Sequence, residues 1–216
     1  MDLRTALRTT GAVRTFTSAV VTDATLHEIL DDARFAPSGG NRQPWKVAVV
    51  RDAAMRHEMA RLMRPIWEEY LGANATGATA FAFGRSIEAA PIAAPNALLD
   101  GIADVPVVLA VAGDLHRISV MDGGLERPAV TGGASLYPLC WSIVLAARAR
   151  GLGGVITTFL SRAEPATIPL LGLPADHALA ATIFLGVAEH QPTKLTRRPV
   201  EHFTTVDRFD GPPFHG

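Results

Sequence analysis

The sequence predicts a mixed fold in which helices cover a β-sheet. Two observations carry this prediction: strand-like runs alternate with helical patterns, and 48% of the 216 residues are hydrophobic, enough for one buried core. No repeat or linker divides the sequence, so we expect residues 1–216 to form a single domain. Lys and Arg number 20 against 21 Asp and Glu, so the charge balance gives no support for a nucleic-acid or anionic-membrane partner.

The first half of the chain is expected to hold two helices, one strand and an irregular segment. Apolar residues recur with helical spacing in Leu26–Phe35, where Asp23 can cap the start, and in Ala53–Leu71. The β-branched run Lys46–Val50 between them predicts a strand. The stretch Gly72–Gly101 is rich in Ala, Gly and Pro and too long for an ordinary loop, which indicates a mobile or irregular flap.

The second half predicts three more strands and two helices. Continuous apolar character indicates strands at Val105–Ala112, Val155–Thr158 and Ala178–Val187. A short helix is expected at Ala163–Leu171, and a long one at Thr131–Arg150, ended by a glycine. The long helix is apolar on most faces, so the fold or a partner subunit must cover it.

The chain ends in an extended polar tail, His190–Gly216, with Phe203, Val206 and Phe209 as apolar anchors. We expect this tail to dock on another surface, for which a second subunit is a candidate. The N-terminus lacks the apolar core of a signal peptide, and no apolar run reaches the ~20 residues of a membrane span, so a cytoplasmic protein is predicted. The single cysteine, Cys140, lies in an apolar run and is expected to be a buried, unreactive side chain.

One loop has the composition of a binding loop for a flat heterocycle. In Ala36-Pro37-Ser38-Gly39-Gly40-Asn41-Arg42-Gln43-Pro44-Trp45, two prolines fix the backbone on either side of a polar turn. The glycines let backbone N–H groups approach a ligand, and Ser38, Asn41 and Gln43 can both donate and accept hydrogen bonds. An ordinary connection between a helix and a strand explains the same residues equally well.

Cationic side chains near both ends of the chain suggest a phosphate site. Arg14 follows a Thr- and Gly-containing turn, and Arg197 and Arg198 lie in the tail beside Lys194. Arginine forms paired hydrogen bonds to phosphate oxygens, and a terminal phosphate carries close to two charges. The alternative for each single arginine is a solvated surface charge.

Gly153 and Gly154 belong to a glycine-rich turn in which a helix precedes and a strand follows. This is the reverse of the order in a dinucleotide-binding turn, so a Rossmann fold is not expected. The glycines either let the backbone pass close to a ring or simply end the helix. The seven histidines do not pair with Cys or carboxylates at ligand spacing, so no metal site is predicted.

In this order, the three features resemble the nitroreductase family of FMN enzymes. The resemblance runs from Arg14-Thr15-Phe16 through the Pro-Ser-x-x-Asn-x-Gln-Pro-Trp string to Arg197-Arg198-Pro199-Val200-Glu201. It implies an α+β fold of three layers, α/β/α, with a central mostly antiparallel sheet. It further implies a domain-exchanged homodimer with two flavins at the interface, in which the tail wraps the partner subunit.

The resemblance also implies roles for particular residues. Arg14 and one of Arg197 or Arg198 would bind the FMN phosphate, and Asn96 would stand where many members have an asparagine. Gly153, Gly154 and the backbone after them would face the flavin ring. The residues implied to line the flavin from the other subunit are Pro37, Ser38, Gly39 and Asn41, within the loop that also holds Gln43.

The sequence departs from the family pattern at two places. Thr10, Gly11 and Ala12 stand where an Arg-x-Ser is common, so Arg8 or Thr9 would have to substitute in the phosphate grip. The lysine that many members have just before the central strand has no counterpart. A cation there would stabilise a reduced flavin, so its absence leaves the flavin potential and the substrate class open.

The implied activity is transfer of a hydride from NADH or NADPH to FMN, followed by reduction of a small acceptor at the same face. No catalytic side chain is predicted, since the flavin performs the chemistry. Nitroaromatics, quinones, enones and halogenated phenols are all compatible acceptors. The alternatives are a member of the flavin-consuming or reductive dehalogenase branches, and a flavin-binding protein without turnover.

Overall fold

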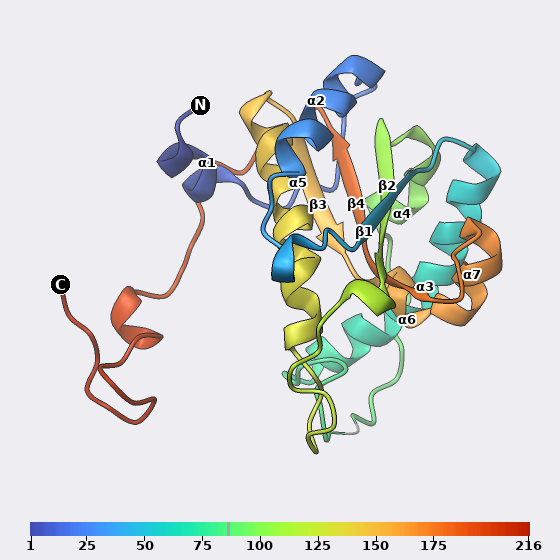
Figure 1. The fold of residues 1–216 in the computed structure, drawn as a ribbon. Coiled ribbons are helices and arrows are strands. Elements are labelled where there is room, and N and C mark those ends of the chain that lie inside the picture. The colour runs from blue at the N-terminus through green and yellow to red at the C-terminus, as the bar shows by residue number, and fades with distance from the viewer. Residues whose placement is uncertain (86) are drawn as a thin grey trace.

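Four strands form the sheet at the centre of the computed structural model, which describes residues 1–85 and 87–216 (Figure 1). They are β1 (Trp45–Val49), β2 (Val107–Asp114), β3 (Gly153–Thr157) and β4 (His177–Gly186), in the spatial order β1-β2-β4-β3. Every neighbouring pair is antiparallel. The family-based expectation is therefore confirmed, whereas the alternation of helices and strands could not have fixed strand direction.

Helices α2 (Asp23–Ala33) and α5 (Tyr137–Ala149) cover one face of the sheet. Their apolar residues pack against every second residue of the two central strands, because side chains of a strand alternate between its faces. From the strands, this core contains Val107, Leu109, Val111, Ala181, Ile183 and Leu185.

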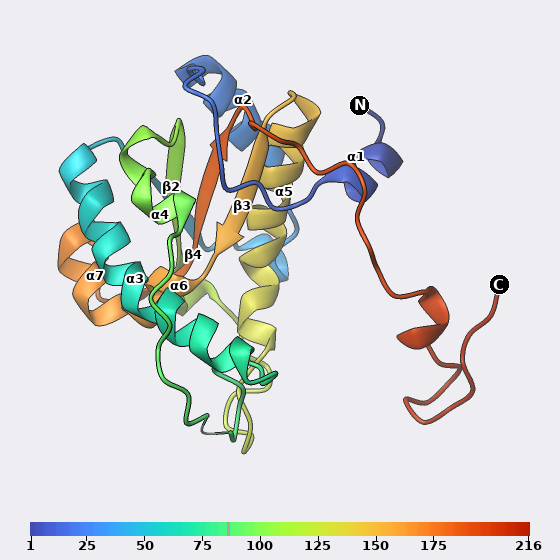
Figure 2. The same cartoon turned by 180° about the vertical axis from the view of Figure 1, so that it is seen from behind.

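The opposite face carries α3 (Ala53–Ala75), α4 (Ala97–Asp100), α6 (Phe159–Arg162) and α7 (Glu164–Leu171). Helices α3, α4 and α6 supply buried residues to a second core, which is built around the fully buried ring of Phe184 (Figure 2). The sheet thus lies between two layers of helices, as the resemblance implied. None of the described helices is long and apolar enough to cross a bilayer.

The long helix expected at Thr131–Arg150 is shorter in the structure. Thr131–Ser135 forms a separate 3₁₀ turn, and α5 begins only at Tyr137. Pro138 lies in the first turn of α5, where its missing N–H is not needed for a helical hydrogen bond, so it starts the helix instead of interrupting it. Tyr137 and Trp141 remain exposed, so one chain alone leaves part of α5 uncovered.

The capping of α2 also differs from the expectation. The side chain of Thr22, and not that of Asp23, accepts the hydrogen bond from the Thr25 N–H. Asp23 is the first helical residue, where its charge still complements the helix dipole, and it pairs with Arg51. The helix ends at Ala33, so Phe35 lies outside it and is exposed.

Both terminal segments lie on the same side of the molecule, away from the sheet. An unexpected helix, α1 (Leu3–Thr9), is capped by Asp2, and the tail leaves β4 alongside it before running out into solvent (Figures 1 and 2). The apolar tail residues Phe203, Val206 and Phe209 are exposed. The region expected to be an irregular flap is irregular at residues 76–85 and 87–96, but its first residues extend α3 and its last ones form α4.

The segment that connects β2 to α5 is held in place by the side chain of Asp122. Its carboxylate accepts hydrogen bonds from the Thr131 hydroxyl (2.5 Å) and the Val130 N–H (2.9 Å), and it pairs with Arg127 at 2.6 Å. These contacts hold the pKa of Asp122 well below its usual range. The hydrogen bond from the Thr131 hydroxyl contributes most to this lowering.

We expect this carboxylate to stabilise the fold at neutral pH and to lose that effect in acid. A group whose pKa is lowered by folding contributes fully above its unfolded pKa of about 4, and its contribution falls as the pH drops further. The urea midpoint of Asp122→Asn should therefore lie below that of the unchanged protein at pH 7, with a narrower gap at pH 3. An equal gap at both pH values would contradict this role.

Cys140 is fully buried in the α5 core, and burial raises the pKa of its thiol to about 11. The thiolate is the reactive form, so the native thiol should resist alkylation at pH 8 and react only after denaturation. Mass spectrometry after iodoacetamide treatment, with and without urea, measures this directly. Rapid alkylation of the folded protein would contradict the burial of this side chain.

Candidate functional site

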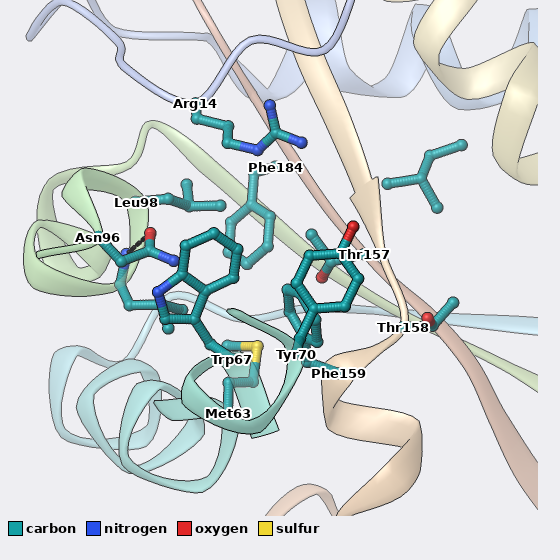
Figure 3. A pocket seen from close by; sticks show the side chains of 12 residues that line it. Arg14, Met63, Trp67, Tyr70, Asn96, Leu98, Thr157, Thr158, Phe159 and Phe184 are labelled. Atoms are coloured by element: carbon teal, nitrogen blue, oxygen red, sulfur yellow. Dashed lines mark hydrogen bonds between the residues drawn. The ribbon is translucent and has the colours of Figure 1, made fainter. Parts of the chain in front are cut away.

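A cavity of about 230 Å³ opens on the face of the sheet that carries α3 and α4 (Figure 3). Its walls come from the N-terminal segment, α3, the start of α4, the end of β3 and the start of α6. The lining residues are Arg14, Met63, Trp67, Tyr70, Asn96, Leu98, Leu99, Ile156, Thr157, Thr158, Phe159 and Phe184.

Arg14 reaches this cavity because the segment before it runs along the edge strand β3. Ala12 pairs with Gly154, and the Val13 N–H donates to the Gly154 carbonyl at 3.0 Å. This pairing places the Arg14 side chain over the cavity, where Figure 3 shows it above Phe184. Arg14 takes part in none of the ion pairs between described residues, so its charge is available to a ligand.

Asn96 faces Trp67 across the same cavity, at the start of α4 (Figure 3). Its Oδ1 accepts a hydrogen bond from the Leu99 N–H at 3.2 Å and caps the helix, and its own N–H donates to Asp100 at 2.9 Å. With the oxygen engaged in the cap, the Nδ2 group is the part of the side chain left to donate to a ligand.

Three aromatic side chains form another wall of the cavity. Trp67 and Tyr70 of α3 are stacked, with ring centroids 5.9 Å apart and planes at 21°. Phe159 meets both edge-on, at 5.9 and 5.8 Å. These three residues were not predicted as site residues from the sequence. Trp67 and Tyr70 are three positions apart in one helix, which places both side chains on the same side of it. This spacing was the one sequence feature that could have indicated an aromatic wall.

Two buried polar atoms in this wall have no hydrogen-bond partner among the described residues. They are the Trp67 Nε1 and the Thr157 hydroxyl. Buried polar groups are normally hydrogen-bonded, so these two atoms are exceptions, and their burial keeps them from facing the cavity directly. Among the described residues that line the cavity, Arg14 and Tyr70 are the two with ionisable side chains.

These features are compatible with the ring of a flavin. The cavity offers a cation, an amide donor and a hydroxyl beside apolar and aromatic surface, the combination that a flat heterocycle with polar edges requires. Its volume is below the ~300–1,000 Å³ of typical small-molecule sites, as expected if a further wall comes from another chain.

The polar loop after α2 does not line this cavity. It lies against the turn before α5, where the Gly39 N–H donates to the Ser135 hydroxyl at 3.0 Å. Within the loop, Ser38 accepts from the Gln43 N–H at 3.0 Å, and Gln43 donates to Asn41 at 3.1 Å. Pro37, Gly39, Asn41 and Gln43 are all exposed in the single chain.

The backbone of this loop is held in a conformation that side chains rarely adopt. Asn41 and Gln43 have φ angles of 52° and 47°, in the left-handed region that favours glycine. Such conformations persist where the surrounding structure imposes them and are common at ligand sites. The loop is thus consistent with a binding role that a second copy of the chain would complete.

Gly153 and Gly154 are buried at the start of β3 and are not among the residues that line the cavity. A Cβ on Gly153 would lie 2.7 Å from Val13, and one on Gly154 would lie 2.5 Å from Leu185. Gly153 thus lets the N-terminal segment pack on β3, and Gly154 leaves room for Leu185 of the neighbouring strand β4. The backbone that lines the cavity lies two to five residues further on, at Ile156–Phe159.

The cations expected to share a phosphate are not brought together. Arg14 lines the cavity beside α3 and α4, whereas Arg197 lines a different cavity together with Arg8 and Lys194. Arg198 is exposed and lines neither of the two. Among the described residues, no cluster of His, Cys, Asp and Glu could hold a metal ion.

Comparison with known proteins identifies the family to which this chain belongs. The NADPH:FMN oxidoreductase from Vibrio harveyi, solved in complex with NAD⁺, has the same fold, with a TM-score of 0.69 and 19% identity over 95% of this chain and 76% of that one. The two chains therefore share a fold. The model of the nitroreductase family matches residues 7–187, so the chain belongs to the nitroreductase family of oxidoreductases.

Two further relatives have similar sequences along most of their length. An NADH dehydrogenase from Thermus thermophilus is 28% identical, covering 93% of this chain and 94% of the relative. A 5,6-dimethylbenzimidazole synthase from Rhodobacter capsulatus is 31% identical over 85% of this chain and 82% of the relative. The relatives thus include two different activities.

Proposed function

We propose that this protein is an FMN-dependent oxidoreductase that uses NADH or NADPH to reduce a small aromatic or conjugated acceptor. The carrying observation is the cavity in which the unpaired cation Arg14 and the amide of Asn96 face a wall of stacked aromatic rings. Nitroaromatics, quinones and enones are planar and conjugated, as this wall requires.

The residues around the cavity would bind the flavin ring and the acceptor and orient them. Arg14 would hold negative charge that develops on the bound ring, and Asn96 would donate to its polar edge. Trp67, Tyr70 and Phe159 would exclude water and give planar groups a surface to stack on. When bound, FMN would supply the hydride chemistry, and no side chain of the cavity would be required as an acid or base.

We further propose that the working form is a homodimer with exchanged tails. The single chain exposes 12796 Å², against about 9,600 Å² expected for a compact monomer of 22.9 kDa. The excess is of the size that an obligate subunit interface covers. In such a dimer, Pro37, Ser38, Gly39 and Asn41 of one chain would line the flavin held by the other.

The cofactor prediction is tested by releasing it. Protein purified with added FMN should be yellow, and heat denaturation should release a flavin that chromatographs as FMN. FAD in the supernatant, or failure to bind any flavin on reconstitution, would rule out the proposed cofactor.

Turnover is tested with the FMN-loaded protein under nitrogen. Addition of NADH or NADPH should bleach the flavin absorbance, and a nitroaromatic, quinone or enone should restore it. The two reductants, compared at equal concentration, give the nicotinamide preference. A flavin that neither reductant bleaches would identify a flavin-binding protein without turnover.

A second candidate is a benzimidazole-forming activity, because a relative of 31% identity bears the name 5,6-dimethylbenzimidazole synthase. That product shares the dimethylbenzene ring of a flavin, so the activity would consume the flavin. Chromatography of the flavin after reduction and exposure to air distinguishes the reductase activity from the synthase activity. Recovery of all the FMN indicates a reductase, and loss of FMN with appearance of the benzimidazole indicates the synthase.

A further inference from the structure

We propose that a hollow beside Arg85 binds an acidic group of the electron acceptor, so that the favoured acceptors are aromatic or conjugated acids. The proposal rests on the FMN-dependent function above and narrows its class of acceptor. It gives a role to the irregular segment between α3 and α4, which carries none of the residues expected to bind the cofactor except Asn96 at its end.

The hollow, which we call the Arg85 hollow, has a volume of about 330 Å³. It lies where the C-terminal half of α3 and the end of α6 meet the irregular segment. Its lining includes Glu69 and Ala73 of α3, Phe81 and Arg85 of the segment, and Arg162 of α6. A hollow of this size can admit the charged end of a small molecule.

The charges around the Arg85 hollow do not cancel. Two arginines line it, and Glu69 is the one carboxylate among its described lining residues. Arg162 pairs with Glu69 at 3.4 Å. Arg85 takes part in none of the ion pairs between described residues. One positive charge is therefore left for a ligand to balance.

The guanidinium of Arg162 is held in position before any ligand binds. Its central carbon lies 4.2 Å from the centroid of the Phe81 ring, a cation–π contact that adds to the pair with Glu69. That pair is the single hydrogen bond that the Arg162 side chain forms with described residues. A guanidinium has five N–H donors, so others can bind a carboxylate together with Arg85.

The segment that carries Arg85 is anchored on α3. A Cβ at Gly72 would overlap the carbonyl oxygen of Ala90, so the glycine lets the returning chain lie directly on the helix. One turn earlier in α3, the Glu68 carbonyl accepts a hydrogen bond from the Ile92 N–H at 3.1 Å. The wall of the hollow is thus formed in advance, which reduces the conformational entropy that binding costs.

The Arg85 hollow and the cavity beside α3 and α4 are built on the same two helices. Trp67, Tyr70 and Phe159 line the cavity (Figure 3). Ala73 and Arg162 line the hollow, and each lies three residues beyond one of the aromatic residues. Six positions of α3 separate Trp67 from Ala73, which corresponds to about 9 Å along the helix. An acceptor stacked on the aromatic wall therefore reaches the hollow with an acidic arm of a few carbon atoms.

The phosphates of the nicotinamide reductant are the competing ligand for this hollow. Glu69 balances one of the two guanidinium charges, so the hollow offers a single net positive charge. One carboxylate matches that charge, whereas the diphosphate of a dinucleotide carries at least two negative charges. The charge balance therefore favours a carboxylate on the acceptor.

The first test compares γ-(para-nitrophenyl)butyrate with its primary amide, which has the same ring and chain and no charge. With FMN-loaded protein and saturating NADH or NADPH, kcat/KM for the acid should exceed that for the amide about tenfold. This is the low end for a charge-assisted contact, because Arg85 is exposed. Arg85→Gln should remove the preference by lowering kcat/KM for the acid alone.

The matched control is Arg61→Gln, which removes an exposed charge from α3 outside the hollow. It should keep the preference for the acid. Equal kcat/KM values for acid and amide in the unchanged protein, or a preference that survives in Arg85→Gln, would overturn the proposal. A raised KM for the nicotinamide in Arg85→Gln, with the preference for the acid retained, would assign the hollow to the phosphates of the reductant.

The second test measures binding without turnover. In calorimetry on the oxidised, FMN-loaded protein, the acid should bind about tenfold tighter than the amide, again the low end for an exposed charge-assisted contact. Arg85→Lys keeps the charge and should retain most of the difference, and Arg85→Gln should lose it. A flavin that neither nicotinamide bleaches would refute the proposed function, and equal affinities for acid and amide would refute the anion site itself.

Discussion

A chain that ends at Glu189 is expected to lose its flavin and its dimeric state together. The deletion removes Arg197 and Arg198, one of which is expected to bind the FMN phosphate, and the exposed apolar residues of the tail. It would also uncover the surface of the partner on which the exchanged tail is proposed to pack. An apolar interface of the obligate type is not replaced by other contacts when half of it is missing.

Sedimentation velocity and flavin absorbance, recorded on the same sample, measure both effects. The full chain with FMN should sediment as a yellow dimer, and the truncated chain should be colourless and aggregate or sediment as a monomer. Removal of only His215 and Gly216 is the control and should change neither property. A truncated chain that is soluble, monomeric and yellow would show that flavin binding requires neither the tail nor a partner.

The boundaries of the helices and strands could be predicted from the sequence where interactions between near neighbours in the chain determine them. The apolar periodicity of α2 and α3 and the β-branched strands predicted those elements to within a few residues. Helix α5 was predicted too long because its apolar residues extend upstream of Pro138, and composition does not distinguish a 3₁₀ turn from a first helical turn. Helix α1 was missed because its seven residues are mostly polar.

The candidate site was only partly predictable, since it is made by contacts between distant segments. Arg14 and Asn96 were singled out, and they do line one cavity. The sequence could not show that Arg14 and Arg197 lie in different cavities, because that depends on how the first residues run along β3. It also gave no reason to connect Trp67 with Phe159, which are 92 positions apart along the chain and meet only through packing of α3 on α6.

Replacing Arg14 by alanine is expected to weaken the binding of FMN and riboflavin alike. Among the described residues that line the cavity beside α3 and α4, Arg14 is the one cation. A charge-assisted hydrogen bond is worth roughly 1.5–3 kcal/mol. At about 1.4 kcal/mol per decade, the Kd of each flavin should rise about 10- to 150-fold.

The same substitution should lower the midpoint potential of the bound flavin. Reduction adds negative charge to the ring, and a nearby cation stabilises the reduced state more than the oxidised state. Arg14→Lys keeps the charge and should retain most of the potential, even where it loses affinity because lysine cannot form a paired hydrogen bond. Titration with a redox dye at saturating FMN measures the potential independently of affinity. An unchanged Kd and potential in Arg14→Ala would show that Arg14 is a solvated surface charge with no contact to the flavin.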